Sequence, residues 1–372
     1  MSSIALAFLL SLLAVSFCFF LVFNIFRKLN TIFSTEHTSK ARDQVKSRIE
    51  NFLPKPENEF KEGLEEFVCD TLKSDRNYRA VVDDYLLKAL DQPNPENRER
   101  LIAIARRLDF LSECQTQIRS RSLGISALGS RRAGLYDFTE TVEDMVAALD
   151  VLSSENQFEI LMALTRIGDA DALSRAFERI KTHIIINERA VIEILSAFPG
   201  REKKLELFRN MIHGDIEYIT VLFLKAADRE MVQVLLNDII TVLHDGNMEI
   251  RAAAVRALST LGKEAPVEEL IRALEDNDWE VRSLAAKALE PVITGEASNA
   301  LYRALFDQQW WVRQNAANAL LKHPGYEVLF ILAAESGDEY TRDSIISALE
   351  NEGNPLLLRD IRIMSAPVSR TL

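Results

Sequence analysis

The chain has 372 residues, of which 27% are charged and 48% hydrophobic, and its formal net charge is −12. This acidic balance argues against general binding of nucleic acid, which needs a basic surface. The three cysteines, Cys18, Cys69 and Cys114, have neither the spacing of a metal site nor the even number of a disulfide framework. The length suits two or three ordinary domains or one solenoid, and the few glycines and prolines favour helices joined by short turns.

An uncharged apolar run opens the chain, from Ile4 to Phe26. As a helix rising ~1.5 Å per residue, it would be roughly 34 Å long, which is enough to cross the hydrocarbon core of a bilayer. We therefore predict a transmembrane helix over residues 4–26. The alternative is a cleaved signal peptide, which would make the rest a secreted solenoid. That alternative is disfavoured because the run lacks a basic segment before it and a small-x-small cleavage site.

Basic residues flank this run on its C-terminal side only: Arg27, Lys28, Lys40, Arg42, Lys46 and Arg48. The positive-inside rule then places everything after the helix in the cytoplasm. The predicted location is therefore the inner (cell) membrane, with a single pass. Residues 27–56 are expected to form a basic juxtamembrane linker or polar helix. This collar either lies against anionic lipid headgroups or serves only to set the topology.

Two amphipathic helices are predicted next, over Glu57–Lys73 and Asn77–Leu90, and together they form an N-terminal helical cap at residues 57–95. From residue 96 a spacing of roughly thirty residues between turn signals persists, although the repeated residues are eroded. We therefore interpret residues 96–352 as a solenoid of about eight repeats, clearest at 245–350, and not as a separate fold.

The clearest repeats place an Asp, an Ile or Val, and an Arg at fixed spacing, and the whole pattern returns every 31 residues. The three copies are Asp245-x4-Ile250-Arg251, Asp276-x4-Val281-Arg282 and Asp307-x4-Val312-Arg313. Small and apolar residues follow each Arg at helical spacing, so that one helix face can pack closely on the next repeat. A repeated unit of this length indicates an all-α solenoid, because one helix pair cannot bury its apolar face alone.

The Asp and Arg of each repeat are expected to form a structural ladder. The Asp precedes the helix and can cap its backbone N–H groups. The Arg, in the first helical turn, can bind a carboxylate or carbonyl of the adjoining repeat. The alternative for Arg251, Arg282 and Arg313 is contact with a partner. Asp338 continues the series in a shortened terminal repeat, and residues 353–372 are predicted to be a flexible tail.

The D-x4-[IV]-R-x2-A-x2-A-L units of residues 245–320 resemble HEAT repeats, in the short bacterial form also found in phycobilisome lyases. The apolar N-terminus together with Trp310-Trp311-Val312-Arg313 resembles a bacterial family of membrane-anchored HEAT-repeat proteins. That resemblance implies a scaffold or adaptor associated with membrane glycosyltransferases. The likeness to phycobilisome lyases implies an alternative, a bilin-lyase-like enzyme or its accessory protein, although fold likeness does not carry function.

No catalytic, cofactor-binding or metal site is predicted, and we expect the protein not to be an enzyme. The five histidines are scattered, and the metalloprotease, thiol-redox and nucleophile-elbow motifs are missing from the sequence. Gly124-x4-Gly129 lacks the Lys-Ser/Thr that a phosphate-binding loop requires. The expected partners are therefore a protein and the membrane, without nucleic acid or metal.

Three tryptophans, Trp279, Trp310 and Trp311, begin repeats and are the candidate partner-binding residues. One interpretation is that they pack on the preceding repeat, and the other is that they anchor a partner, since Trp is enriched at interface hot spots. Trp279 and Trp310 share one position of the 31-residue frame and are predicted to pack in the core. Trp311 occupies the position of Glu249 and Glu280, so it is predicted to be exposed and to contact the partner.

Overall fold

The structure is a computed structural model that describes residues 39–74, 76–92, 97–150, 154–180, 187–352 and 354–365. Within these ranges the chain is helical, with turns and short connections and without strands, as predicted. The predicted transmembrane helix at residues 4–26 lies outside the described residues. None of the helices in the described ranges is both long and apolar enough to span a membrane.

The chain divides into two compact units, Met1–Met145 and Val146–Leu372. The division falls inside the stretch 96–352 that the sequence analysis assigned to the repeats.

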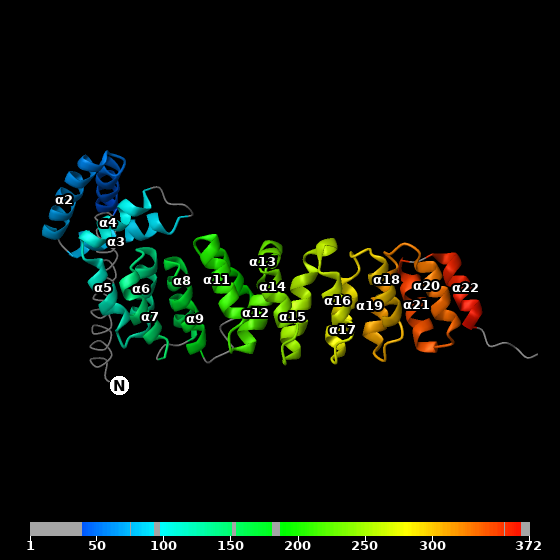
Figure 1. The fold of residues 1–372 in the computed structure, drawn as a ribbon. Helices are drawn as coiled ribbons and strands as arrows, with labels where there is room; N and C mark the ends of the chain where they lie inside the picture. Colours follow the sequence, from blue (N-terminus) through cyan, green and yellow to red (C-terminus); the bar gives the residue numbers. More distant parts are fainter. Residues whose placement is uncertain are drawn as a thin grey trace, which may run out of the picture. The chain divides into compact units, whose positions relative to one another are not determined.

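The described part of the N-terminal unit consists of short helices (Figure 1). They are a helix over residues 39–52, α2 (Glu57–Lys73), α3 (Arg76–Leu90), α4 (Arg98–Arg107), α5 (Phe110–Ile118), α6 (Leu123–Leu135), the 3-10 turn η1 (Thr139–Thr141) and the first part of α7 (Val142–Ala148). The two helices predicted for the cap are confirmed as α2 and α3.

Residues 39–52 are helical, which agrees with the helical alternative for the predicted juxtamembrane segment, but the sequence did not predict that one face of this helix is buried. Val45 and Ile49 are fully buried, and the ring of Phe52 lies 5.9 Å from that of Phe60 in α2. These apolar residues recur every three or four positions, so a helix that is otherwise polar has one buried stripe. Gly63 of α2 permits the close packing, because a Cβ there would lie 2.7 Å from the Cβ of Phe52. This part of the chain therefore belongs to the core of the unit.

The C-terminal unit is a succession of antiparallel helix pairs. After the end of α7 they are α8 (Ser154–Ile167), α9 (Ala170–Arg179), α10 (Glu188–Ala197), α11 (Arg201–Ile212), α12 (Glu217–Ala226), α13 (Arg229–Val234), α14 (Leu236–Val242), α15 (Met248–Ser259), η2 (Gly262–Glu264), α16 (Val267–Ala273), α17 (Trp279–Ala288), α18 (Gly295–Ala304), α19 (Trp310–Leu320), α20 (Tyr326–Glu335), α21 (Glu339–Glu352) and α22 (Pro355–Ser365). Figure 1 shows them following one another in chain order.

Two layers result from this alternation. In the first layer α8, α10, α12, α15, α17, α19 and α21 each pack on the next, and in the second layer α16, α18, α20 and α22 do the same. Since helices of one layer alternate with those of the other along the chain, all helices of the first layer run in the same direction. Their N-terminal ends therefore lie along one edge of the unit.

The 31-residue frame describes the core of this unit as predicted. The repeated Ala and Leu positions of α15, α17 and α19 are completely buried: Ala254, Ala285, Ala316, Leu258, Leu289 and Leu320. Each buried Leu stabilises the stack by about 1.5–3 kcal/mol relative to an exposed one. The alanines let consecutive helices of the layer approach closely.

The C-terminal end differs from the predicted flexible tail. Residues 355–365 form α22, which packs on α20 and α21 and buries Leu357 and Ile361. These two apolar residues are four positions apart and so share one helix face. Pro355 begins the helix at the position where its missing N–H is not needed. Only residues 354–365 of the predicted tail are described.

Candidate functional site

The arginines of the repeats connect consecutive repeats of the first layer. Arg251, in the first turn of α15, donates from Nε and Nη2 to the two carboxylate oxygens of Asp276, at 2.9 and 3.0 Å. Its Nη1 donates to the carbonyl oxygen of Asp245 at 2.9 Å. Arg282 repeats this geometry one repeat later, with Asp307 at 2.8 and 3.1 Å and the carbonyl of Asp276 at 2.8 Å.

Each Asp of the ladder also fixes the turn before its own helix. The carboxylate of Asp276 accepts the backbone N–H of Asp278 at 2.9 Å, and Asp245 and Asp307 bind the equivalent N–H groups of their repeats at 2.7 and 2.8 Å. Burial alone would raise the pKa of Asp276, but the hydrogen bonds from Arg251 and from that backbone N–H outweigh it and lower the pKa. The side chains of the pairs Arg251–Asp276 and Arg282–Asp307 are only 12–16% exposed. In each pair the Arg binds both oxygens of a carboxylate that also holds the turn before the next helix.

The ladder ends at the fourth Asp of the series. Arg313 donates to the carbonyl of Asp307 at 2.8 Å, as its counterparts do, but within the described residues it forms no ion pair with Asp338. Its guanidinium instead lies 5.4 Å from the ring centre of Tyr340, and its Nε is 3.4 Å from the hydroxyl of Ser344. In the last repeat an aromatic ring therefore takes the place of the carboxylate as the partner of the arginine.

Aromatic side chains project from the N-terminal ends of the same helices. Trp279 is the first residue of α17, Trp310 and Trp311 are the first two residues of α19, and Tyr340 is the second residue of α21. We refer to these four residues as the aromatic edge. Trp311 is 55% exposed, Tyr340 70% and Trp310 45%, whereas Trp279 is half-buried. Because α17, α19 and α21 pack in sequence, these residues lie along one edge of the unit.

The prediction that Trp310 packs in the core is wrong, whereas Trp311 is exposed as predicted. The two indole rings contact each other edge to face, with their centres 4.6 Å apart. The physical reason is that side chains in the first helical turn lean toward the N-terminus, beyond the packed part of the layer. Val312 and Arg313 fill the inward positions, and both are buried. Partner binding by the three tryptophans stays a prediction.

The charges near the aromatic edge favour a cation over an anion. Residues 245–350 contain ten basic and eighteen acidic residues. Arg251 and Arg282 are engaged by carboxylates of the ladder, whereas Glu249 and Glu339, at the starts of α15 and α21, are exposed. Exposed indole faces attract ammonium and guanidinium groups, and nearby carboxylates strengthen that attraction. The edge can therefore bind a segment that carries both apolar and basic side chains.

Two exposed aromatic residues, Tyr340 and Phe306, were not predicted from the sequence. A signal for Tyr340 was present in the sequence, because an aromatic residue lies two to four positions after each of Asp276, Asp307 and Asp338. Exposed Phe306, whose ring contacts Tyr302, carries no such signal. Among the residues that the structure describes, no group of three or more His, Cys, Asp or Glu side chains is placed to hold a metal ion.

Residues 236–320 and 268–350 match the family model of HEAT repeats. Among solved structures, the chain is similar to an engineered protein at 19% identity, covering 85% of this chain and 95% of that one, with a TM-score of 0.35. A mutant of Kap121p matches at 14% identity over 83% of this chain and 41% of its own, with a TM-score of 0.39. Human deoxyhypusine hydroxylase in complex with glycerol matches at 16% identity over 76% and 98%, with a TM-score of 0.28. No curated protein matches this sequence.

The family match covers the part of the chain in which the ladder and the aromatic edge lie. The fold of that part is therefore a HEAT-repeat solenoid, a type of architecture whose extended surfaces commonly bind other proteins.

Proposed function

We propose that this protein is a membrane-anchored scaffold that holds a partner protein on the aromatic edge of its HEAT repeats. The observation that carries the proposal is the exposed pair Trp310–Trp311, in mutual contact on a helix end that the ladder fixes from repeat to repeat. Large exposed aromatic residues on a rigid support lose little conformational freedom when a partner covers them.

The chemistry of the edge points to a partner segment with basic side chains beside apolar ones. A lysine or arginine of the partner would lie over an indole face near Glu339 or Glu249, and an apolar side chain would pack against the second indole. The resemblance stated for the sequence suggests that the partner is a membrane glycosyltransferase or another component of an envelope-polysaccharide system.

Anchoring is proposed for residues 4–26, with the repeats on the cytoplasmic face of the inner membrane. The uncharged run and the basic residues that follow it support this topology. A reporter that is active only outside the cytoplasm, fused after Leu372, should remain silent. Strong reporter activity, or a mature N-terminus beginning after Phe26, would contradict the proposal.

Affinity purification from detergent-solubilised membranes tests the edge itself. Trp311→Ala should weaken recovery of the partner by about 30-fold, since truncating an interface hot spot costs about 2 kcal/mol. The melting temperature should hardly change because the side chain is more than half exposed. Ile293→Ala is the matched control, since Ile293 is 58% exposed beyond the opposite end of α17. Equal recovery by the two variants would show that the partner does not bind at this edge.

The bilin-lyase alternative rests on the repeat pattern alone, and the same fold serves many unrelated functions. Incubation of the purified protein with a bilin and an acceptor protein distinguishes the two functions. Covalent transfer of the bilin would replace the scaffold proposal.

A further inference from the structure

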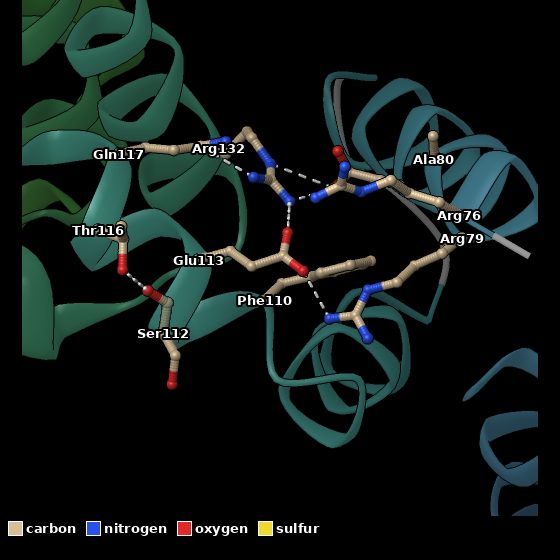
Figure 2. Close-up of a pocket in the computed structure, with 10 residues that line it drawn as sticks. Arg76, Arg79, Ala80, Phe110, Ser112, Glu113, Thr116, Gln117 and Arg132 are labelled. Atoms are coloured by element: carbon tan, nitrogen blue, oxygen red, sulfur yellow. Dashed lines mark hydrogen bonds and ion pairs between the residues drawn. The ribbon is translucent and has the colours of Figure 1, made fainter. Parts of the chain in front are cut away.

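The N-terminal unit contains a cavity of about 590 Å³, outside the 31-residue repeats of residues 245–350 (Figure 2). Its volume lies within the range of roughly 300–1,000 Å³ that is usual for sites of small ligands. The charged residues of its lining are Arg76, Arg79 and Asp83 from α3, Glu113 from α5 and Arg132 from α6. Three helices thus bring five charges around one space.

The inner wall of the cavity is a buried ion-pair network. Arg132 is only 4% exposed and donates to Asp83 at 3.0 Å, to Glu113 at 3.2 Å and to the side-chain oxygen of Gln117 at 2.9 Å. The hydroxyl of the fully buried Tyr136 also donates to Asp83. Burial lowers the pKa of Arg132, but its hydrogen bond to Asp83 and the electrostatic interactions with Asp83, Cys114 and Tyr136 together raise it by more, so the guanidinium stays charged. A buried cation of this kind requires both of its carboxylates.

The outer wall contains donors that this network does not use. Among the described residues, Arg79 donates only through Nη2, to Glu113 at 2.6 Å and to the carbonyl of Leu108, so its Nε and Nη1 are left without an acceptor. Arg76 forms neither a hydrogen bond nor an ion pair with the residues that the structure describes. It precedes Arg79 by three positions and so lies on the same side of α3. Figure 2 shows both side chains extending from α3 toward Glu113 and Arg132.

The balance of charge around the cavity is positive by one. Asp83 is bound by Arg132 and Tyr136, and Glu113 by Arg132 and Arg79, so neither carboxylate is free to bind an added cation. The unused donors belong to guanidinium groups, whose planar forks match carboxylate and phosphate oxygens. An anion placed between Arg76 and Arg79 would therefore complete the charge balance of the site.

We propose that this cavity binds a small molecule through an anionic group, a carboxylate or a phosphate, held between Arg76 and Arg79. The site would give the scaffold a ligand-binding unit separate from the aromatic edge. The proposal does not depend on the partner, because the cavity belongs to the N-terminal unit alone.

The test uses the full chain in detergent, with inorganic phosphate and acetate as separate probes and sodium chloride at matched ionic strength as the background. Binding is read by calorimetry and by slower amide exchange in α3 and α5. At least one probe should bind, and Arg76→Gln should weaken that binding about tenfold or more. Arg76 has no partner among the described residues of its unit, so this variant should keep its fold.

Arg121→Gln is the matched control, because Arg121 is also exposed and lies outside the cavity lining. Binding of phosphate alone would assign the site to phosphorylated ligands, and binding of acetate alone would assign it to carboxylates. Either result supports the proposal if the control variant retains the affinity. The proposal is overturned if neither probe binds at tens of millimolar, or if Arg76→Gln and Arg121→Gln weaken binding equally.

Discussion

Replacing Arg282 with methionine should destabilise the repeats around α17 by about 3 kcal/mol. Methionine keeps the apolar stem of the side chain, so the loss is mainly polar. The substitution removes two hydrogen bonds to the carboxylate of Asp307, at 2.8 and 3.1 Å, and two to backbone carbonyls, at 2.8 and 3.0 Å. Removing one partner of a buried ion pair costs roughly 3–5 kcal/mol. The lower end applies because Arg282 and Asp307 keep 16% and 14% of their side-chain surface exposed.

Native-state hydrogen exchange on the full chain measures this effect where it occurs. A loss of about 3 kcal/mol corresponds to a more than hundredfold increase in local opening. In a repeat stack this increase should centre on α17 and α19 and leave α8 and α10 unchanged. Arg256→Met is the matched control, since Arg256 is an exposed arginine of the preceding first-layer helix. If both variants exchange alike, the ladder does not stabilise the stack.

A double-mutant cycle with Asp307→Asn isolates the ion pair. The double variant should lose less than the sum of the single variants, because removing the carboxylate also removes the uncompensated charge that Arg282→Met leaves behind. Additive losses would mean that the two side chains contribute independently, against the geometry of the pair.

Three further results are expected. Leu289→Ala should lower the local free energy of unfolding by about 2–5 kcal/mol, because Leu289 is completely buried. The control Ile293→Ala, at an exposed site, should change amide exchange much less. Equal changes would refute the repeat frame. The pKa of Asp276 is lowered in the folded chain. Its carboxylate should therefore stabilise the fold fully above pH 3.8, the ordinary pKa, and this stabilisation should be lost as the pH falls through the lowered pKa. Acid unfolding of the Asp276→Asn variant, which lacks the carboxylate, should show a smaller dependence of stability on pH over this range. Burial raises the pKa of the Cys114 thiol to about 12, so an alkylating reagent at pH 8 should modify exposed Cys69 and spare Cys114. Peptide mass spectrometry measures the modification of each cysteine. Rapid modification of Cys114 would contradict its burial.

The sequence by itself determined the architecture of the repeats. A repeat contacts mainly its neighbours, so the 31-residue period relates each Arg to the Asp one repeat later and each Leu to the same layer of the core. The same local logic located α2 and α3, whose apolar spacing and flanking turn residues lie within a single stretch of chain. It did not predict α22 or the buried face of the helix at residues 39–52, because both lie outside the clear 31-residue repeats.

Only the tertiary structure decided which side chains remain available for binding. The frame equated Trp310 with Trp279, yet Trp310 is exposed because its side chain leans beyond the helix end and meets Trp311. The frame also continued the ladder to Asp338, whereas Arg313 lies on Tyr340. In the N-terminal unit, Arg132 and Asp83 are 49 residues apart and no period relates them. Their contact depends on how α3, α5 and α6 dock, and the cavity that they line exists only once that packing has formed.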